Sequence, residues 1–125
     1  MLYGLISDVH GNIDALEVAL SHLRRLEVEK IAFLGDAVGY GANPNEVCNR
    51  IREVADFAVV GNHDAAVAGR MSYDGYYDAA KQSLDWCVDV ITPENMTWLK
   101  ELPYKQREGH IEFCHGAPVN PEVFD

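Results

Sequence analysis

The sequence has no apolar run approaching the roughly 20 residues that a membrane-spanning helix needs, and it reaches Asp8 before any signal-peptide core could form. It also has no internal repeat, low-complexity tract or linker. We therefore expect a cytoplasmic protein with no membrane partner. A length of 125 residues, with 48% hydrophobic and 24% charged residues, predicts a single globular domain over 1–125.

Cysteine and basic residues are both scarce. Cys48, Cys87 and Cys114 are odd in number and form no CxxC pair, which indicates reduced thiols. Ten basic residues stand against twenty acidic ones, for a formal net charge of -10. This charge disfavours bulk electrostatic binding to nucleic acid or to an anionic membrane. An anionic substrate would need a local source of positive charge, and bound metal ions supply one.

Apolar runs and helical periodicity alternate along the chain. Short β-branched runs predict strands at 2–6, 31–34, 57–60 and 111–113. Asn12 is placed to cap a first helix, and Asn43, Pro44 and Glu46 predict a capping-box start for a second. Two further helices are expected at 76–91 and from Thr92, followed by a hairpin over 104–114. Two successive strand-helix-strand units indicate an α/β fold with a largely parallel sheet and right-handed crossover helices.

Polar clusters follow each predicted strand. They are Asp8 and His10 in SDVHGN, Asp36 in LGD, Asn62, His63 and Asp64 in VGNHD, and His115 in FCHG. Open α/β sheets bind ligands at the carboxyl ends of their strands, so these side chains can converge on one point. The convergence predicts a site for two metal ions.

The residue types indicate which metals would bind. In an extended strand Asp8 and His10 would point the same way, with Val9 directed back into the core. Carboxylate and imidazole ligands suit manganese, iron, zinc, cobalt or nickel better than calcium, and the lack of clustered thiolates argues against a structural zinc centre. Asp36, followed by a turn, is placed to bridge two ions.

Three further residues complete the predicted chemistry. Asn62 would add an oxygen, and His115 a nitrogen, to the second ion. Two ions about 3.5 to 4 Å apart lower the pKa of a shared water toward about 7 and clamp an in-line displacement at phosphorus. His63 would then be free to protonate the leaving oxygen as a general acid.

The ordered motifs D-x-H, GD, GNHD and H-G resemble those of the calcineurin-like metallophosphoesterases. GDAVGYGANPNEV, GNHDAAVAG and CHGAP are similar to the bacterial phosphodiesterase-like branch and differ from the protein serine/threonine phosphatases. The resemblance implies a four-layer α/β/β/α sandwich that hydrolyses phosphate mono- or diesters. It implies two divalent transition-metal ions, with manganese ahead of iron, zinc, cobalt or nickel. Asp8, His10 and Asp36 would hold the first ion, Asp36, Asn62 and His115 the second, and His63 would be the acid.

The resemblance also implies what lies beyond this sequence. Family members carry a later Gly-His-x-His motif, and only GAPVNPEVFD follows His115 here. We therefore expect the N-terminal half of the sandwich, truncated at the C-terminus, with an exposed apolar face that a second copy or the missing half covers. This leaves an alternative function open, a non-catalytic metal-binding or protein-interaction module on the same scaffold.

Other features allow less specific explanations. Asp64 is expected to cap a short following helix, and Asn12 to act as a cap before any second contact. Cys114 is expected to be a buried structural thiol on the face opposite His115. Tyr40, in the glycine-rich loop, could line a substrate pocket or serve packing.

Overall fold

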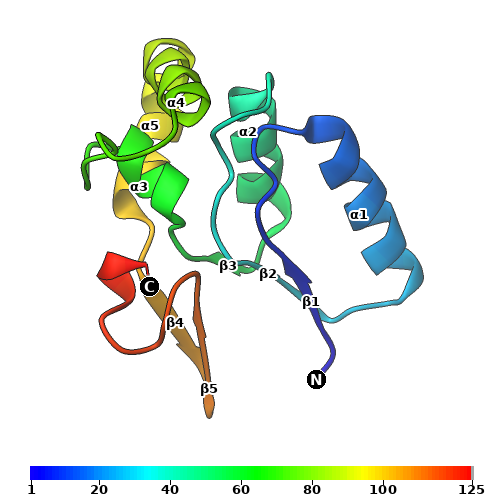
Figure 1. Cartoon of the computed structure of the whole chain (residues 1–125). Coiled ribbons are helices and arrows are strands. Elements are labelled where there is room, and N and C mark those ends of the chain that lie inside the picture. The colour runs from blue at the N-terminus through cyan, green and yellow to red at the C-terminus, as the bar shows by residue number, and fades with distance from the viewer. Residues whose placement is uncertain (125) are drawn as a thin grey trace.

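A three-stranded parallel sheet with the order β1-β2-β3 forms the centre of the computed structural model, which describes residues 1–124 (Figure 1). Its strands and crossover helices alternate as β1 (Tyr3–Ile6), α1 (Ile13–Arg25), β2 (Lys30–Phe33), α2 (Pro44–Val54) and β3 (Phe57–Ala58). The chain continues through α3 (Asn62–Val67), α4 (Asp78–Val90), α5 (Pro93–Glu101), β4 (Lys105–Glu108), β5 (Ile111–Cys114) and the 3-10 helix η1 (Pro121–Val123). The predicted α/β class and parallel crossovers are confirmed.

The helix starts follow the sequence signals in two cases out of three. The Asn12 side chain accepts a hydrogen bond from the Ala15 N–H at 3.0 Å, as predicted for a cap. Thr92 likewise accepts from Asn95 at 3.3 Å. The capping box predicted for Asn43 is wrong: its side chain makes no capping bond, and its own N–H donates to the Gly11 carbonyl at 2.9 Å. That bond leaves no N–H for a glutamate to accept, and it ties the start of α2 to the loop after β1.

The two faces of the sheet are covered differently. A Cβ at Gly4 would lie 2.8 Å from Leu23, so this face of β1 packs directly on α1. On the opposite face the Phe113 ring of β5 lies 5.6 Å from Tyr3 and 5.0 Å from Phe57, measured between ring centroids. Leu5 is nevertheless 55% exposed, so the hairpin covers this second face only in part.

The strand that precedes His115 lies outside the parallel sheet. β5 pairs antiparallel with β4, with Glu108 opposite Ile111, which confirms the predicted hairpin. Gly109 takes a φ of 63° in its two-residue turn, a conformation that glycine adopts without steric cost. The polar residues after β5 therefore reach the edge of the sheet from a separate element.

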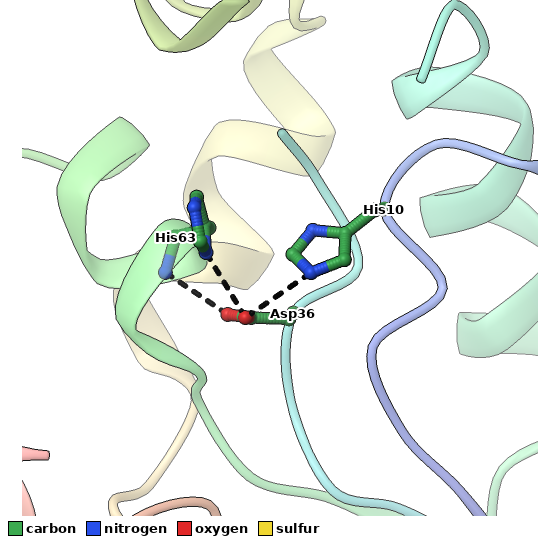
Figure 2. A group of neighbouring side chains, drawn as sticks. All are labelled: His10, Asp36 and His63. Atoms are coloured by element: carbon green, nitrogen blue, oxygen red, sulfur yellow. Dashed lines mark hydrogen bonds and ion pairs between the residues drawn. The ribbon is translucent and has the colours of Figure 1, made fainter. Parts of the chain in front are cut away.

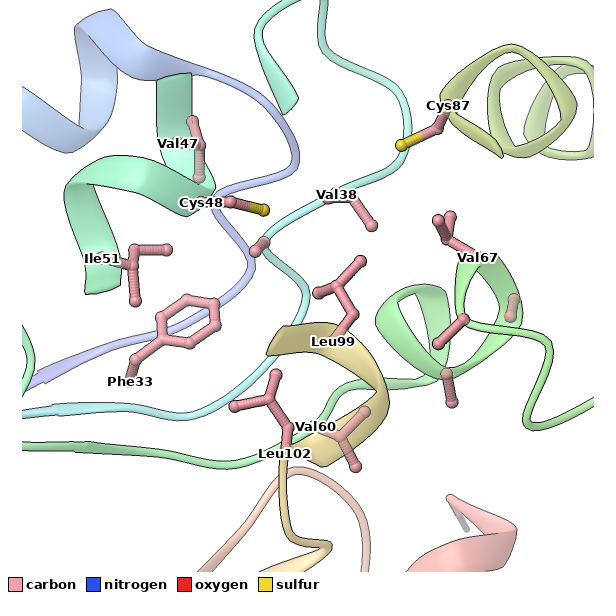
Figure 3. Packing of buried hydrophobic residues seen from close by; sticks show 14 of the residues in the cluster. Phe33, Val38, Val47, Cys48, Ile51, Val60, Val67, Cys87, Leu99 and Leu102 are labelled. Atoms are coloured by element: carbon pink, nitrogen blue, oxygen red, sulfur yellow. The ribbon is translucent and has the colours of Figure 1, made fainter. Parts of the chain in front are cut away.

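The main core lies between α2, α3, α5 and the loop that follows β2 (Figure 3). Val38, Ile51 and Leu99 are at most 2% exposed. Cys87 is buried, and burial raises the pKa of its thiol to about 11. Cys114 is only partly buried, contrary to prediction, because its Sγ lies at the open end of β5 and donates to the Gly116 carbonyl.

None of the helices within residues 1–124 combines the length and the apolar character needed to cross a membrane.

Candidate metal centre

The loops after β1 and β2 run side by side and place the first candidate ligands. The Asp8 N–H donates to the Gly35 carbonyl at 2.9 Å, and the His10 N–H donates to the Asp36 carbonyl at 3.0 Å. These bonds continue the parallel pairing beyond the last strand residues. Asp8 and His10 are therefore fixed beside Asp36 by the backbone itself.

The backbone at these ligands is not extended, as the sequence reasoning assumed. Asp8, His10 and Asp36 have φ values of 57°, 49° and 64°, in the left-handed region that non-glycine residues rarely adopt. The His10 Nε2 still lies 3.6 Å from an Asp8 oxygen, and Val9 packs against the core as predicted. The predicted orientation is thus reached through a left-handed turn. Such strain costs about 1 to 3 kcal/mol per residue and is typical of functional sites.

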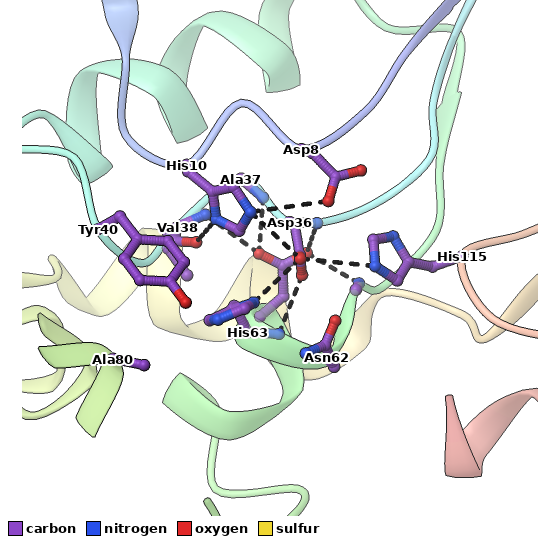
Figure 4. A network of polar contacts seen from close by, with 12 residues as sticks. Asp8, His10, Asp36, Ala37, Val38, Tyr40, Asn62, His63, Ala80 and His115 are labelled. Carbon is purple, nitrogen blue, oxygen red and sulfur yellow. Dashed lines mark hydrogen bonds and ion pairs between the residues drawn. The ribbon is translucent and has the colours of Figure 1, made fainter. Parts of the chain in front are cut away.

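Asp36 is the centre of the cluster (Figures 2 and 4). Its Oδ2 lies 3.5 Å from His10 Nε2, 3.5 Å from His115 Nε2 and 3.0 Å from His63 Nδ1. Its Oδ1 accepts the His63 backbone N–H at 2.9 Å. Burial acts to raise the pKa of Asp36, but the His63 hydrogen bond and the His115 imidazole more than offset it, so the pKa is lowered.

Backbone carbonyls fix the orientation of two of these imidazoles. His10 Nδ1 donates to Val38 O at 2.9 Å, and His115 Nδ1 donates to Leu34 O at 2.7 Å. Because a carbonyl can only accept, each Nδ1 carries a proton, and the neutral form of each ring would present its Nε2 lone pair to Asp36. Lone pairs facing a carboxylate repel it unless a cation lies between them. This is the arrangement by which proteins hold metal-binding histidines, so the residues present fit divalent ions.

Two overlapping groups of donor atoms each lie within 4.8 Å of one another, and Asp36 belongs to both. They are His10, Asp36 and His63, and Asp8, Asp36 and His115. Shared membership accords with the bridging position predicted for Asp36. His63, predicted as a proton donor alone, lies as close to Asp36 as the expected ligands do.

Asn62 is the first residue of α3 and lies at the edge of the cluster. Its Nδ2 donates to the Tyr76 hydroxyl at 3.0 Å, and Figure 4 shows its side-chain oxygen turned toward Asp36 and His115. All six predicted site residues are therefore brought together at one place in the fold. The Tyr76 contact had no signal in the sequence, because it joins the start of α3 to the segment before α4, which share no periodicity.

Asp64 is not the N-cap residue that was predicted: Gly61 holds that position, and Asp64, the fully buried third residue of α3, accepts the Gly61 N–H with its carboxylate. One carboxylate oxygen accepts the N–H groups of Asp36 and Gly61 at 2.7 and 2.9 Å. The other accepts those of Ala37 and Val38 at 2.8 and 3.3 Å. Burial and then the Asp36 charge raise the pKa of Asp64 to about 7, against these donors. Asp64 thus holds the loop that carries Asp36 onto the start of α3.

The loops meet closely enough to require glycine. A Cβ at Gly35, whose φ is 100°, would lie 2.7 Å from both Gly61 Cα and His115 Nδ1. A Cβ at Gly61 would collide with the Asp36 carboxylate. The GD and GN pairs of the sequence therefore allow three loops to meet around one carboxylate.

Comparison with known proteins agrees with this geometry. A family model described as calcineurin-like phosphoesterase matches residues 1–124. The chain belongs to this family. The resemblance noted in the motifs is therefore confirmed.

The relatives of this phosphoesterase chain are longer than it is. The uncharacterized protein MJ0912 of Methanocaldococcus jannaschii is 38% identical over 128 residues, a match that covers 99% of this chain and 53% of that protein. A metallophosphoesterase from Sphaerobacter thermophilus superimposes with a TM-score of 0.81 at 38% identity, covering 97% of this chain and 49% of the other. The hypothetical protein PH1004 from Pyrococcus horikoshii superimposes with a TM-score of 0.79 at 25% identity, and the match covers 96% of this chain and 56% of that protein. The chain thus spans about half the length of these relatives.

Proposed function

We propose that this chain carries the two-ion site of a hydrolase of phosphate mono- or diesters. The observation that supports the proposal most strongly is the approach of three imidazole nitrogens to one buried carboxylate oxygen of Asp36. They come from the loop after β1, the start of α3 and the segment after β5. Two of these imidazoles, His10 and His115, are held in place by backbone carbonyls that accept hydrogen bonds from their Nδ1 atoms. A donor set of this kind suits transition-metal ions.

The ligand assignment follows the motif resemblance and the position of His10 Nε2, 3.6 Å from Asp8 Oδ1 and 3.5 Å from Asp36 Oδ2. The two compact donor groups of the structure instead pair His10 with His63 and Asp8 with His115. Asp8, His10 and Asp36 would hold one ion, and Asp36, Asn62 and His115 the other, with manganese as the preferred metal. When bound, the ions would lower the pKa of water and offset the charge of the phosphate oxygens. The protein itself supplies no basic side chain among these residues, which agrees with its net charge of -10.

His63 is proposed as the proton donor to the leaving oxygen. Its Nδ1 is engaged with Asp36 Oδ2 at 3.0 Å, which fixes the ring. Its Nε2 is buried and has no hydrogen-bond partner among residues 1–124. A proton carried on this atom is the one that the ring could release, and the contact with Asp36 orients it.

Two variants test this function in the manganese-loaded chain. Asp36→Asn should abolish measurable hydrolysis of nitrophenyl phosphate and bis-nitrophenyl phosphate, because both ions lose their shared carboxylate. His63→Ala should slow the hydrolysis of alkyl esters by about 100-fold or more and that of nitrophenyl esters far less, since general-acid catalysis matters only for poor leaving groups. Asp89→Asn, at an exposed position of α4, is the matched control. Equal losses for alkyl and nitrophenyl esters would reassign His63 to binding.

The non-catalytic alternative rests on the length of the chain. The chain spans about half the length of its relatives, so metal binding and turnover are separate properties to test. Tight manganese binding without hydrolysis of either nitrophenyl ester would favour this metal-binding module over the hydrolase.

A further inference from the structure

Two hollows flank the Asp36 cluster, and they differ in chemistry. One, of about 570 Å³, is lined by Asp8, His10 and the glycine-rich loop. The other, of about 410 Å³, has three aromatic walls, Tyr40, Tyr76 and Tyr77, and we call it the tyrosine hollow. Its inner end is formed by Asn62 and His63, so it opens directly from the candidate metal centre.

Hydrogen bonds hold the hydroxyl of one tyrosine and the backbone of another. The Tyr76 hydroxyl accepts a hydrogen bond from Asn62 at 3.0 Å, and its ring centroid lies 5.6 Å from that of His63. The Tyr40 N–H donates to Ser83 Oγ at 3.1 Å, which anchors the loop to α4. Walls that are fixed before a ligand arrives lose little conformational entropy when it binds.

Tyr40 combines an exposed side chain with a left-handed backbone. Its φ is 65°, a conformation that glycine would adopt freely, and it follows Gly39 in a glycine-rich loop. Its side chain is 55% exposed, and that of Tyr77 is 86% exposed. Figure 4 shows the Tyr40 ring directed toward the cluster, with its centroid 5.2 Å from that of His63. The ring thus packs on His63 and, at 5.1 Å between centroids, on His10, while its exposed part is available to contact a bound molecule.

A buried polar atom lies at the inner end of the same hollow. His63 is only 8% exposed, it lines the tyrosine hollow, and its Nε2 has no partner within the described residues. Buried polar atoms without a partner are rare in folded proteins, and the side chain that carries this one also lines the tyrosine hollow.

We infer that the tyrosine hollow binds the flat aromatic group of the phosphate ester, such as an aryl ring or a nucleobase. This inference rests on the proposed function, which places the phosphate at the Asp36 cluster. No basic side chain lines the hollow, so an uncharged ring fits it better than an anionic group. The ester oxygen between ring and phosphate would then lie beside His63. The hollow thus selects esters by the flatness of their organic group.

The test compares two hydrolysis-resistant probes that differ only in the flatness of the ring, phenylphosphonate and cyclohexylphosphonate. Calorimetric titration of the manganese-loaded chain should show about fivefold tighter binding of the phenyl probe, the scale expected for aromatic pairing. Replacing Tyr40 and Tyr77 by leucine together should reduce this preference to less than about twofold. Tyr76→Phe should retain it, because the ring remains.

Trp86→Leu is the matched control, since Trp86 is an exposed aromatic residue of α4 that does not line the hollow. It should leave the preference unchanged. Equal binding of the two probes by the native chain would overturn the aromatic subsite while phosphate recognition stands. A preference that survives loss of both tyrosines would overturn it too. Failure of both probes to bind in the presence of manganese would overturn the subsite and the phosphoester function together.

Discussion

The Asp36 loop and the β4–β5 hairpin supply residues to the same cluster, but they are held in opposite ways. Asp36 and Asp64 are 2% and 0% exposed, and four backbone N–H groups fix the Asp64 carboxylate between two loops. The hairpin, which carries His115, rests on the sheet through Phe113, and its Ile111 is 49% exposed. One part of the site is therefore fixed by a buried network of backbone hydrogen bonds. The other is held by two ring contacts of Phe113, the His115–Leu34 hydrogen bond and the ion pair between Lys30 and Glu108. The difference predicts that the two ion positions have unequal strength.

The largest effect should come from Asp64→Asn. The amide would turn an NH₂ group toward two backbone N–H donors that now meet a carboxylate oxygen. Unpaired buried donors cost about 1 to 3 kcal/mol each, so we expect the free energy of unfolding to fall by about 4 kcal/mol. Urea denaturation measures this, with Asp89→Asn as the control that should change stability by less than about 0.5 kcal/mol. A loss below 1 kcal/mol would mean that Asp64 does not hold the loops.

Phe113→Ala tests the other side of the comparison. Removing the ring that contacts Tyr3 and Phe57 should lower the free energy of unfolding by about 2 to 3 kcal/mol. We expect a small loss for a phenylalanine because the hairpin is partly exposed. We expect the second ion to be lost with it, because His115 moves with the hairpin, while the first ion remains. Manganese titration of this variant distinguishes the two positions. Loss of both ions together would show that the hairpin also supports the Asp36 loop.

Self-association should be a smaller effect, confined to the open side of the sheet. Leu5, Ile111 and Val119 are 55%, 49% and 75% exposed, and apolar surfaces of this kind are commonly covered by another chain. We expect a dimer or larger species by light scattering coupled to size exclusion, with or without manganese, and a shift toward monomer for Ile111→Lys. A compact monomer at every concentration would contradict this expectation.

Loss of the ion pair between β2 and β4 should have the smallest effect on stability. Lys30 Nζ lies 3.1 Å from Glu108 Oε1, and the hydrogen bond raises the pKa of Lys30 and lowers that of Glu108. The stabilisation from Glu108 is present above pH 4.5 and is lost as the pH falls through its lowered pKa. That from Lys30 is present below pH 10.5 and is lost as the pH rises through its raised pKa.

Glu108→Gln should therefore give a slight decrease in Tm at pH 7, and about 1 M salt should remove the difference from the native chain. Gln82→Glu, at an exposed position of α4, is a control for added charge without a partner. A large salt-independent decrease in Tm would mean that Glu108 acts through packing instead.

The sequence was informative where a local pattern determines structure. Strand runs followed by polar clusters predicted that Asp8, His10, Asp36 and Asn62 would meet, because parallel strands end at one edge of a sheet. His115 was expected to join them for the same reason, but it reaches the cluster from an antiparallel hairpin outside that sheet. The orientation of those side chains was not predictable in the same way. It depends on left-handed backbone at three of them and on carbonyls from distant loops.

Asp64 shows the limit of local rules most clearly. Its position after a strand and before a helix is typical of a cap, and the local rule assigned it that role. Its real partners include three N–H groups 26 to 28 residues earlier in the chain, which no local pattern could identify. The contact between Tyr76 and Asn62, and with it the tyrosine hollow, was unpredictable for the same reason.

The central claim is that the Asp36 carboxylate is shared between two ion positions of unequal affinity. Calorimetric titration of the 125-residue chain with manganese, followed by electron paramagnetic resonance of the loaded protein, tests this directly. We predict two binding steps, the tighter at Asp8, His10 and Asp36, and an exchange-coupled spectrum from a bridged pair that Asp36→Asn abolishes. Binding of two ions with equal affinity in one step, or a spectrum of isolated ions that Asp36→Asn leaves unchanged, would contradict the account.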